Sequence, residues 1–250
     1  MFGRPKLLFD NRFADALPVA SSTAVGYSVA NLADWRPYTW WQPEALPATV
    51  TVDSGAPAAA DYLVVYGHNM GTHGATLELR GSTDNFAASD DLIASTSPAD
   101  DLPFLMQFAS SLYRYRRLRI TGATAPSLAI AAAGTAIELP RHLPTGFDPL
   151  ARKMHGTSNR SMQGHPLGRV FEFEEWSETI QQRNVEQSWV RETFLPAWLS
   201  HLRSTPFVFA WDPAEHADEL YLVSSSGEFK APHRGGQYCD LSFEVTGVHS

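Results

Sequence analysis

The sequence is poor in cysteine and in charge. Cys239 is its one cysteine among 250 residues, so the chain can form neither an intramolecular disulfide framework nor a cysteine-based zinc cluster. Charged side chains make up 18% of the residues and hydrophobic ones 44%, a balance that argues against an intrinsically disordered chain. The net charge of −8 argues against a general nucleic-acid-binding surface, which needs clustered cations.

Long apolar runs and catalytic motifs are also lacking. No stretch of about 18 apolar residues occurs, so we expect no membrane span. Charged residues interrupt the first 13 positions, which therefore lack the apolar core of a signal peptide. There is no Gly-x-Ser-x-Gly elbow and no Walker loop. Because no acid, base, nucleophile or metal-ligand set converges, we predict that the chain is not an enzyme and holds no cofactor or metal.

Aromatic residues, in contrast, are frequent. They make up 12% of the chain, and many lie in short runs bounded by Gly, Pro, Asp or Ser, which is typical of β-rich domains. After an N-terminal arm over residues 1–24, period-two alternation or short apolar runs predict strands at 48–53, 61–66, 75–80, 113–121 and 128–139. With helix periodicity scarce, residues 25–140 are predicted to form an antiparallel β-sandwich.

The second half begins with a break in the pattern. Residues 141–168 are rich in Pro and Gly without periodicity, which predicts a linker or an extended arm. A second β domain is expected over 169–250, with strands at 169–175, 206–211, 219–224 and 237–248 and a helix around 185–203. Pro196 interrupts this helix, so either the helix is kinked or two short helices meet there.

Two groups of residues are candidates for ligand binding. Trp40 and Trp41 could stack on a sugar ring, although adjacent residues of an extended segment point opposite ways, so that packing in the core or an interface is the alternative. His68, Asn69 and His73 follow a strand in a Gly-rich turn. They predict either a ligand-binding loop at one end of the sandwich or a polar loop whose side chains hold its own backbone.

The first half resembles the galactose-binding-like sandwich of the discoidin family. The matching segments occur in the family's order: Tyr27 to Asp34, Thr39-Trp40, Thr49 to Gly55, Asp61 to Val65 with Asn69, Gly81 to Asp84, and Tyr115 to Ile120. Ser54 departs from the family's usual Leu. The resemblance implies a jelly-roll sandwich that binds glycans, lipids or proteins through loops at one end, and these loops vary too much for binding residues to be carried over.

The second half resembles the C-terminal region of distal and minor tail proteins of long-tailed bacteriophages. The similarity rests on Phe207 to Pro213 and on the closing segment Tyr238 to Gly247. It implies a tail-tube-like β-barrel with one helix and a structural role at the tail tip or baseplate, in a virion assembled in the host cytoplasm. The implied partners are the tail tube, tape-measure and tail hub proteins and a host surface glycan, with DNA only as passing cargo. The alternative is a stand-alone, discoidin-type carbohydrate-binding protein.

The tail resemblance also implies a homo-oligomeric ring, a hexamer or alternatively a trimer. The predicted strands of the second domain are few, and open sheet edges invite pairing with another chain. A repeated contact of this kind closes into a ring when its rotation closes. The predicted interface consists of apolar residues of these strands: Phe171, Phe173, Phe207, Phe209, Leu241 and Phe243.

Overall fold

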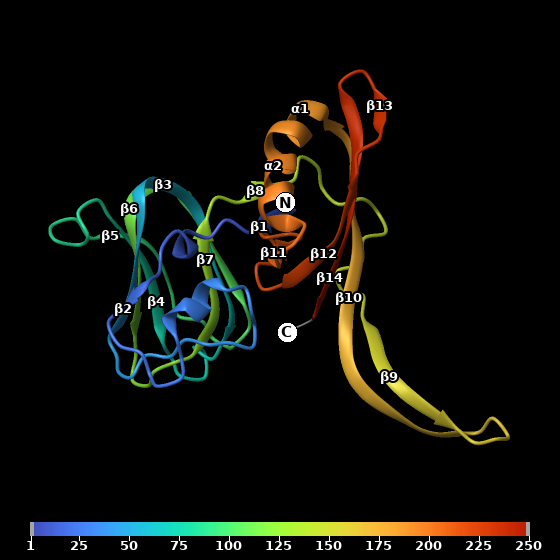
Figure 1. The fold of residues 1–250 in the computed structure, drawn as a ribbon, viewed down its shortest axis with the longest axis horizontal. Helices are drawn as coiled ribbons and strands as arrows, with labels where there is room; N and C mark the ends of the chain where they lie inside the picture. The colour runs from blue at the N-terminus through green and yellow to red at the C-terminus, as the bar shows by residue number, and fades with distance from the viewer. Residues whose placement is uncertain (1–2, 249–250) are drawn as a thin grey trace. The chain divides into compact units, whose positions relative to one another are not determined.

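The computed structural model describes residues 3–248 and is mainly antiparallel β structure (Figure 1). The chain divides into two compact units. Unit 1 comprises residues 3–138 and Phe207–Leu220, and unit 2 comprises Leu139–Pro206 and residues 221–248. The predicted domain limits that reach residues 1, 2, 249 and 250 extend outside the described part of the chain.

Unit 1 contains the predicted β-sandwich, which confirms the fold class of the first half. Its strands follow the order β2 (Val19–Ala20), β3 (Ala48–His68), β6 (Phe104–Thr121), β4 (Thr76–Ser82) and β5 (Asp91–Thr96), and β7 (Leu128–Gly134) pairs with the second part of β3. Two short 3₁₀ helices, η1 (Arg12–Ala14) and η2 (Val29–Ala33), precede β3. All these strand pairs are antiparallel.

The long strands β3 and β6 run through both layers of the sandwich. Their register shifts between Asp53 and Ala58, where Gly55 takes a φ of 75° that suits glycine. Before the shift β3 contributes Val50 and Val52 to the core, and after it Leu63 and Val65, all in one buried cluster. The sequence predicts two strands separated by a turn here, whereas the structure has one strand with a bulge that redirects it.

The N-terminal segment forms part of unit 1. Strand β1 (Lys6–Leu8) pairs on one side with β11 (Phe207–Ala210) and on the other with β8 (Ile137–Glu138). Leu7 and Leu8 are fully buried. Asp10 then accepts a hydrogen bond from the Thr135 backbone N–H (2.9 Å), so the chain enters and leaves the sandwich at one place.

Unit 2 consists of an open sheet and one helical run. The strand order is β12 (Leu220–Lys230), β14 (Tyr238–Val248), β10 (Pro166–Glu186) and β9 (Lys153–Arg160), and β13 (His233–Gly235) pairs with the start of β14. The predicted barrel is not confirmed, because the described strands of this unit form an open order. Strand β9 lies inside the stretch 141–168, for which the sequence predicts a linker or arm.

The helical run spans α1 (Gln187–Trp189), η3 (Val190–Phe194), α2 (Leu195–Ala197) and η4 (Trp198–Leu202) without interruption. Pro196 lies at the first turn of the α2 segment but inside this continuous run, so its missing N–H leaves a backbone carbonyl of the preceding turn without its helical partner. Phe194 and Trp198 pack against Phe229 and Phe243 of the sheet, with ring centroids 5.2–5.9 Å apart. These aromatic contacts form the core of unit 2.

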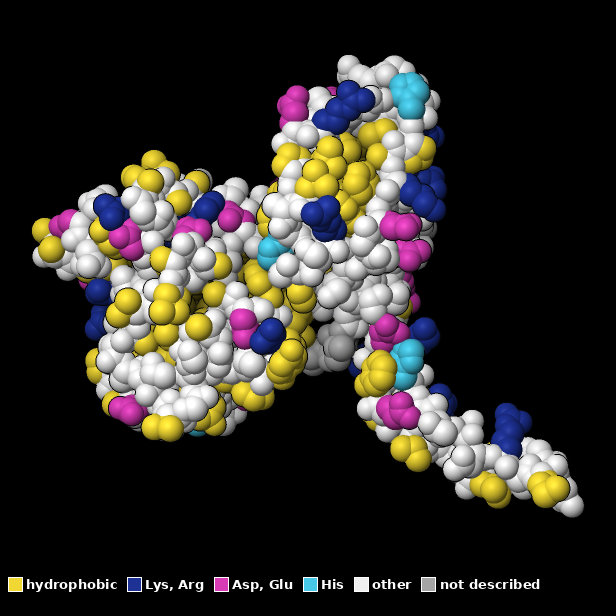
Figure 2. Space-filling model, in the orientation of Figure 1, with side chains coloured by type: hydrophobic (Ala, Val, Ile, Leu, Met, Phe, Trp, Pro, Cys, Tyr) yellow, Lys and Arg dark blue, Asp and Glu magenta, His cyan; other side chains and the backbone are white. Residues whose placement is uncertain are grey.

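Beyond this core, β9 and the facing part of β10 extend as a two-stranded ribbon (Figure 1), which we call the arm (residues 153–175). Large apolar side chains are exposed along it: Met154, Met162, Leu167, Val170, Phe171 and Phe173 (Figure 2). Phe171 and Phe173 therefore lie on the surface, and their role in an interface stays a prediction. The other four predicted interface residues are in the protein's own core, because Phe207, Phe209, Leu241 and Phe243 are at most 2% exposed.

Candidate functional site

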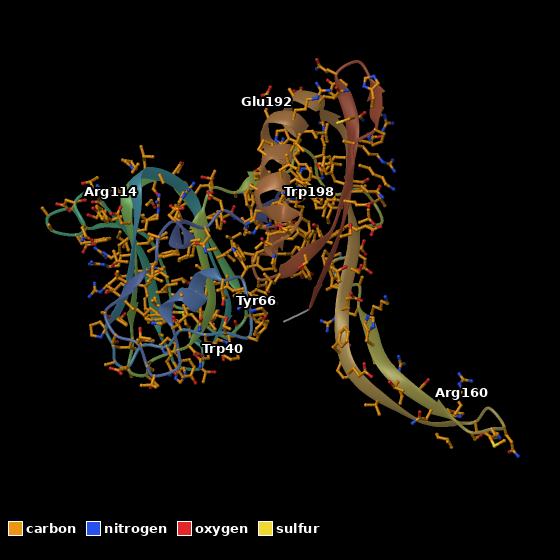
Figure 3. The ribbon with its side chains drawn as sticks, viewed as in Figure 1. Trp40, Tyr66, Arg114, Arg160, Glu192 and Trp198 are labelled. Atoms are coloured by element: carbon orange, nitrogen blue, oxygen red, sulfur yellow. The ribbon has the colours of Figure 1, made fainter. Side chains whose placement is uncertain are left out.

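The two adjacent tryptophans lie at one end of the sandwich and point in opposite directions. The backbone N–H of Trp41 donates to the Leu128 carbonyl (2.8 Å) and its own carbonyl accepts from Leu128 N–H (2.9 Å). The Trp41 indole is fully buried and donates to the Thr23 hydroxyl (3.2 Å). Trp40, labelled in Figure 3, is 41% exposed and Tyr38 is 66% exposed. We call residues 34–41 the aromatic loop.

Polar side chains fix the backbone of the aromatic loop. Asn31 donates from Nδ2 to the Trp40 carbonyl (2.8 Å). The Asp34 carboxylate accepts from the Thr39 hydroxyl (2.8 Å) and from the Arg36 backbone N–H (2.9 Å). These bonds give a structural role to Asn31, Asp34 and Thr39, three residues on which the galactose-binding-like resemblance rests. The exposed aromatic side chains thus sit on a preformed loop.

His68 is a structural residue in this arrangement. Its Nε2 lies 2.7 Å from the Leu102 carbonyl, and its Nδ1 accepts from the Met70 backbone N–H (3.2 Å). The ring is 7% exposed and meets Phe104 edge-on at 5.0 Å. Burial lowers the pKa of His68 from its ordinary 6.5. Both ring nitrogens of His68 therefore contact the backbone of the loops around it.

Asn69 and His73 complete the neighbouring loop. The Asn69 side-chain oxygen accepts from the Ser127 backbone N–H (2.7 Å), and the Asn69 carbonyl accepts from His73 N–H (3.2 Å). The His73 side chain is half-buried. Whether these residues, or Trp40, contact a ligand stays a prediction.

The structure brings these candidates together at one end of the sandwich. Leu128, which bonds Trp41, is also the strand partner of His68, and Ser127 bonds Asn69. Arg114 is labelled near the other end (Figure 3). Of the predicted set, Trp40 and the half-buried Asn69 and His73 leave part of a side chain open to solvent at this end, whereas Trp41 and His68 are buried.

Sequence reasoning missed Arg36 as a member of this site. It is exposed, it lies between Trp35 and Tyr38, and no carboxylate contacts it among residues 3–248. It is also the only Lys or Arg between Arg12 and Arg80. That isolation in the sequence is the signal that could have identified it.

Within residues 3–248 no group of three or more His, Cys, Asp or Glu side chains is placed to hold a metal ion. No helix in the same range is long and apolar enough to cross a membrane. Cys239 is 2% exposed and its thiol lies 3.6 Å from the Val185 carbonyl.

Comparison with known proteins gives similarity of fold only. No family model and no curated protein matches the chain. A chitosan-binding module of a chitosanase/glucanase from Paenibacillus sp. IK-5 is 17% identical, with a TM-score of 0.42 over 49% of this chain and 97% of that one. A module from Clostridium perfringens, solved with GalNAc-β-1,3-galactose, is 17% identical, with a TM-score of 0.42 over 51% of this chain and 99% of that one.

A third solved structure, a module of AlyQ in complex with 4,5-unsaturated mannuronic acid, is 19% identical, with a TM-score of 0.41 over 50% of this chain and 96% of that one. Identities this low bear on the fold alone. Each of these three matches spans about half of this chain and nearly the full length of the solved module.

Proposed function

We propose that this chain is a non-catalytic binding protein whose sandwich contacts carbohydrate through the aromatic loop. The observation behind the proposal is the opposite placement of two neighbours: Trp41 is fully buried and Trp40 is 41% exposed. Burying Trp41 anchors the loop, and the hydrogen bond from Asn31 to the Trp40 carbonyl fixes the backbone from which Trp40 projects. A rigid loop loses little conformational entropy when a ligand binds.

The chemistry of the exposed residues suits a sugar. Trp and Tyr combine a flat apolar face with one polar group, and a sugar ring likewise has an apolar face and a polar rim. Tyr38 and Trp40 lie two residues apart on a loop open to solvent, where a glycan can approach from outside. This arrangement favours binding to an exposed part of a glycan over enclosure of a small molecule.

Trp40→Ala in the full chain tests this proposal. Binding is measured on a glycan array and then by calorimetry with the best ligand. We expect the variant to lose at least about tenfold in affinity, on the scale of one stacked aromatic contact. The matched control is Tyr238→Ala, which removes an aromatic side chain of similar exposure (37%) in unit 2. The proposal fails if the wild-type chain binds no glycan, or if Trp40→Ala binds as well as wild type.

The arm favours a second candidate, a structural role in a multi-copy assembly. A two-stranded ribbon is marginally stable alone in water, and β9 is an edge strand with unpaired backbone groups. The exposed side chains of Phe171 and Phe173 add apolar surface whose contact with water is unfavourable. A second protein chain that covers the arm would pair the free backbone groups of β9 and would bury the side chains of Phe171 and Phe173.

The sequence resemblance to bacteriophage tail proteins indicates the kind of assembly in which this role would be performed. In this candidate the chain is a component of the tail tip or baseplate of a long-tailed bacteriophage and forms a ring, a hexamer or alternatively a trimer, between the tail tube and the host-recognition apparatus. The sandwich would then be a peripheral module that meets a host glycan, so the two candidates are compatible. Locating the chain in purified tail particles, with its copy number, tests this setting.

A further inference from the structure

The aromatic loop carries a positively charged side chain, that of Arg36, which forms no ion pair within residues 3–248. Arg36 precedes Tyr38 by two residues and Trp40 by four, and its side chain is exposed without a carboxylate contact in the described chain. Its backbone is nevertheless fixed, because its N–H donates to Asp34 Oδ1 (2.9 Å) and Pro37 follows it. The Arg36 carbonyl also lies 3.3 Å from the Thr39 hydroxyl, which closes the loop.

Three aspartates near this end of the sandwich already accept hydrogen bonds within the protein. Asp34 accepts from Thr39 and from Arg36 N–H. Asp100 accepts from Leu102 N–H (3.0 Å), and Asp101 accepts from the hydroxyl and the backbone N–H of Thr72 (2.6 and 2.9 Å). Arg36 is therefore a charged group of this end that remains available to a ligand.

We propose that the carbohydrate bound at the aromatic loop is acidic, with a carboxylate that pairs with Arg36 while a sugar ring stacks on Trp40. The planar guanidinium presents parallel N–H groups that match a carboxylate in two hydrogen bonds. Arg36 and Trp40 are four positions apart on the same loop, and both are exposed, so one glycan could contact both. This inference rests on the proposed carbohydrate-binding function and adds the charge of the ligand.

The first measurement is an array of neutral, carboxylated and sulfated glycans, probed with the full chain. We expect the strongest binding among carboxylated glycans, weakening as salt is raised because the contact is exposed. Binding to neutral glycans alone, or to sulfated ones in preference, overturns the inference and leaves the proposed function intact. An absence of binding to every glycan overturns the proposed function itself.

The second measurement uses pectin in its carboxylate form and in its methyl-esterified form, a pair that differs in charge on the same sugar backbone. Arg36→Gln is expected to lose at least about tenfold in affinity for the carboxylate form, because it removes a charge-assisted hydrogen-bonded pair. Its affinity for the methyl ester should not change. Arg36→Lys should fall between Arg36→Gln and wild type, and Trp40→Ala should lose both forms. An equal loss of both forms by Arg36→Gln, or no loss, overturns the inference, as does failure of wild type to prefer the carboxylate form.

Discussion

Arg114 clamps Asp53 across the point where β3 and β6 change register. Its Nε and Nη2 each donate to one carboxylate oxygen, both at 2.8 Å. The backbone N–H of Gly55, inside the bulge, donates to the same carboxylate (2.8 Å). The hydrogen bond from Arg114, followed by that from Gly55, lowers the pKa of Asp53 from 3.8 to about 2. The clamp therefore ties the bulge of β3 to β6.

Acid should release this clamp. The folded-state pKa of Asp53 lies below its unfolded value, so its contribution to stability is present above about pH 4 and disappears as the pH falls toward 2. We expect Asp53→Asn to lower the melting temperature at neutral pH by a modest amount, because both partners are about 40% exposed. The gap to wild type should close between pH 4 and 2. Melting curves that remain equally far apart at pH 2 contradict the assignment.

Arg116 supports the same bend from inside. Its guanidinium is fully buried and donates to the carbonyls of Ala58 (2.5 Å), Ser111 (3.2 Å) and Tyr113 (3.2 Å). Burial lowers its pKa to about 10, so it stays charged at neutral pH. Within residues 3–248 its hydrogen-bond acceptors are these backbone carbonyls and not carboxylates.

Arg116→Met should therefore be among the more damaging substitutions in unit 1. It leaves three carbonyls without their donor, and we expect a loss of roughly 3 kcal/mol in the free energy of unfolding, measured in urea. The control is Arg119→Met on the same strand, whose guanidinium is 43% exposed and lies 3.6 Å from Glu78. That change should cost about 1 kcal/mol or less. Similar losses for the two variants would refute the role given to Arg116.

Three of the strands that the sequence predicts have one face in a core. Residues 48–53, 75–80 and 113–121 alternate because every second side chain is buried, and that burial leaves a period of two in the sequence. Strand β9 shows no such pattern, since its side chains are mostly exposed and no core constrains them. Strand β1 is not predicted for another reason: the residues with which it pairs, Val208 to Ala210 of β11, lie far along the chain.

The candidate site was predictable in part. Period-two geometry correctly implies that Trp40 and Trp41 diverge, but it does not say which is buried; the bridge between Trp41 and Leu128 decides that. Apolar character alone also fails to separate a core from an interface. Phe207 and Phe243 are as apolar as Phe171, yet only Phe171 lies beyond the core of its unit.

The loop of His68 should make stability depend on pH. Burial lowers the pKa of His68 in the folded chain, so below about pH 6.5 the unfolded chain takes up a proton that the folded chain resists. The free energy of unfolding is therefore expected to decrease as the pH falls from 6.5 toward the folded-state pKa. Urea titrations between pH 7.5 and 5, a range of about one unit or more on either side of the ordinary His value, measure this slope.

His68→Gln should flatten that slope even if it lowers stability at every pH, because glutamine has no proton to gain. His73→Gln is the matched control, since this histidine lies in the same loop but is only half-buried. A slope that survives His68→Gln would mean that other groups cause the pH dependence.

The arm makes a prediction about assembly. Phe171 and Phe173 are 56% and 47% exposed, and their strand partners Gly156 and His155 cover them little, although the His155 ring stacks on Phe173 at 4.6 Å. If copies of the chain associate through this surface, making it polar should abolish association without unfolding unit 2. Leu241→Pro, in contrast, is no test of a ring, because Leu241 is 1% exposed and pairs with Gln182 inside the sheet.

Phe171→Ser combined with Phe173→Ser is the informative variant. We expect wild type to form a defined multi-copy species in light scattering at increasing concentration, and the double variant to remain monomeric with an unchanged circular dichroism spectrum. Leu112→Ser, which removes an exposed leucine (63%) from unit 1, should assemble like wild type. A wild-type chain that stays monomeric at high concentration removes the support for the ring, since an edge strand and exposed aromatics then persist without a second copy to cover them. A double variant that still assembles would place the contact elsewhere on the chain.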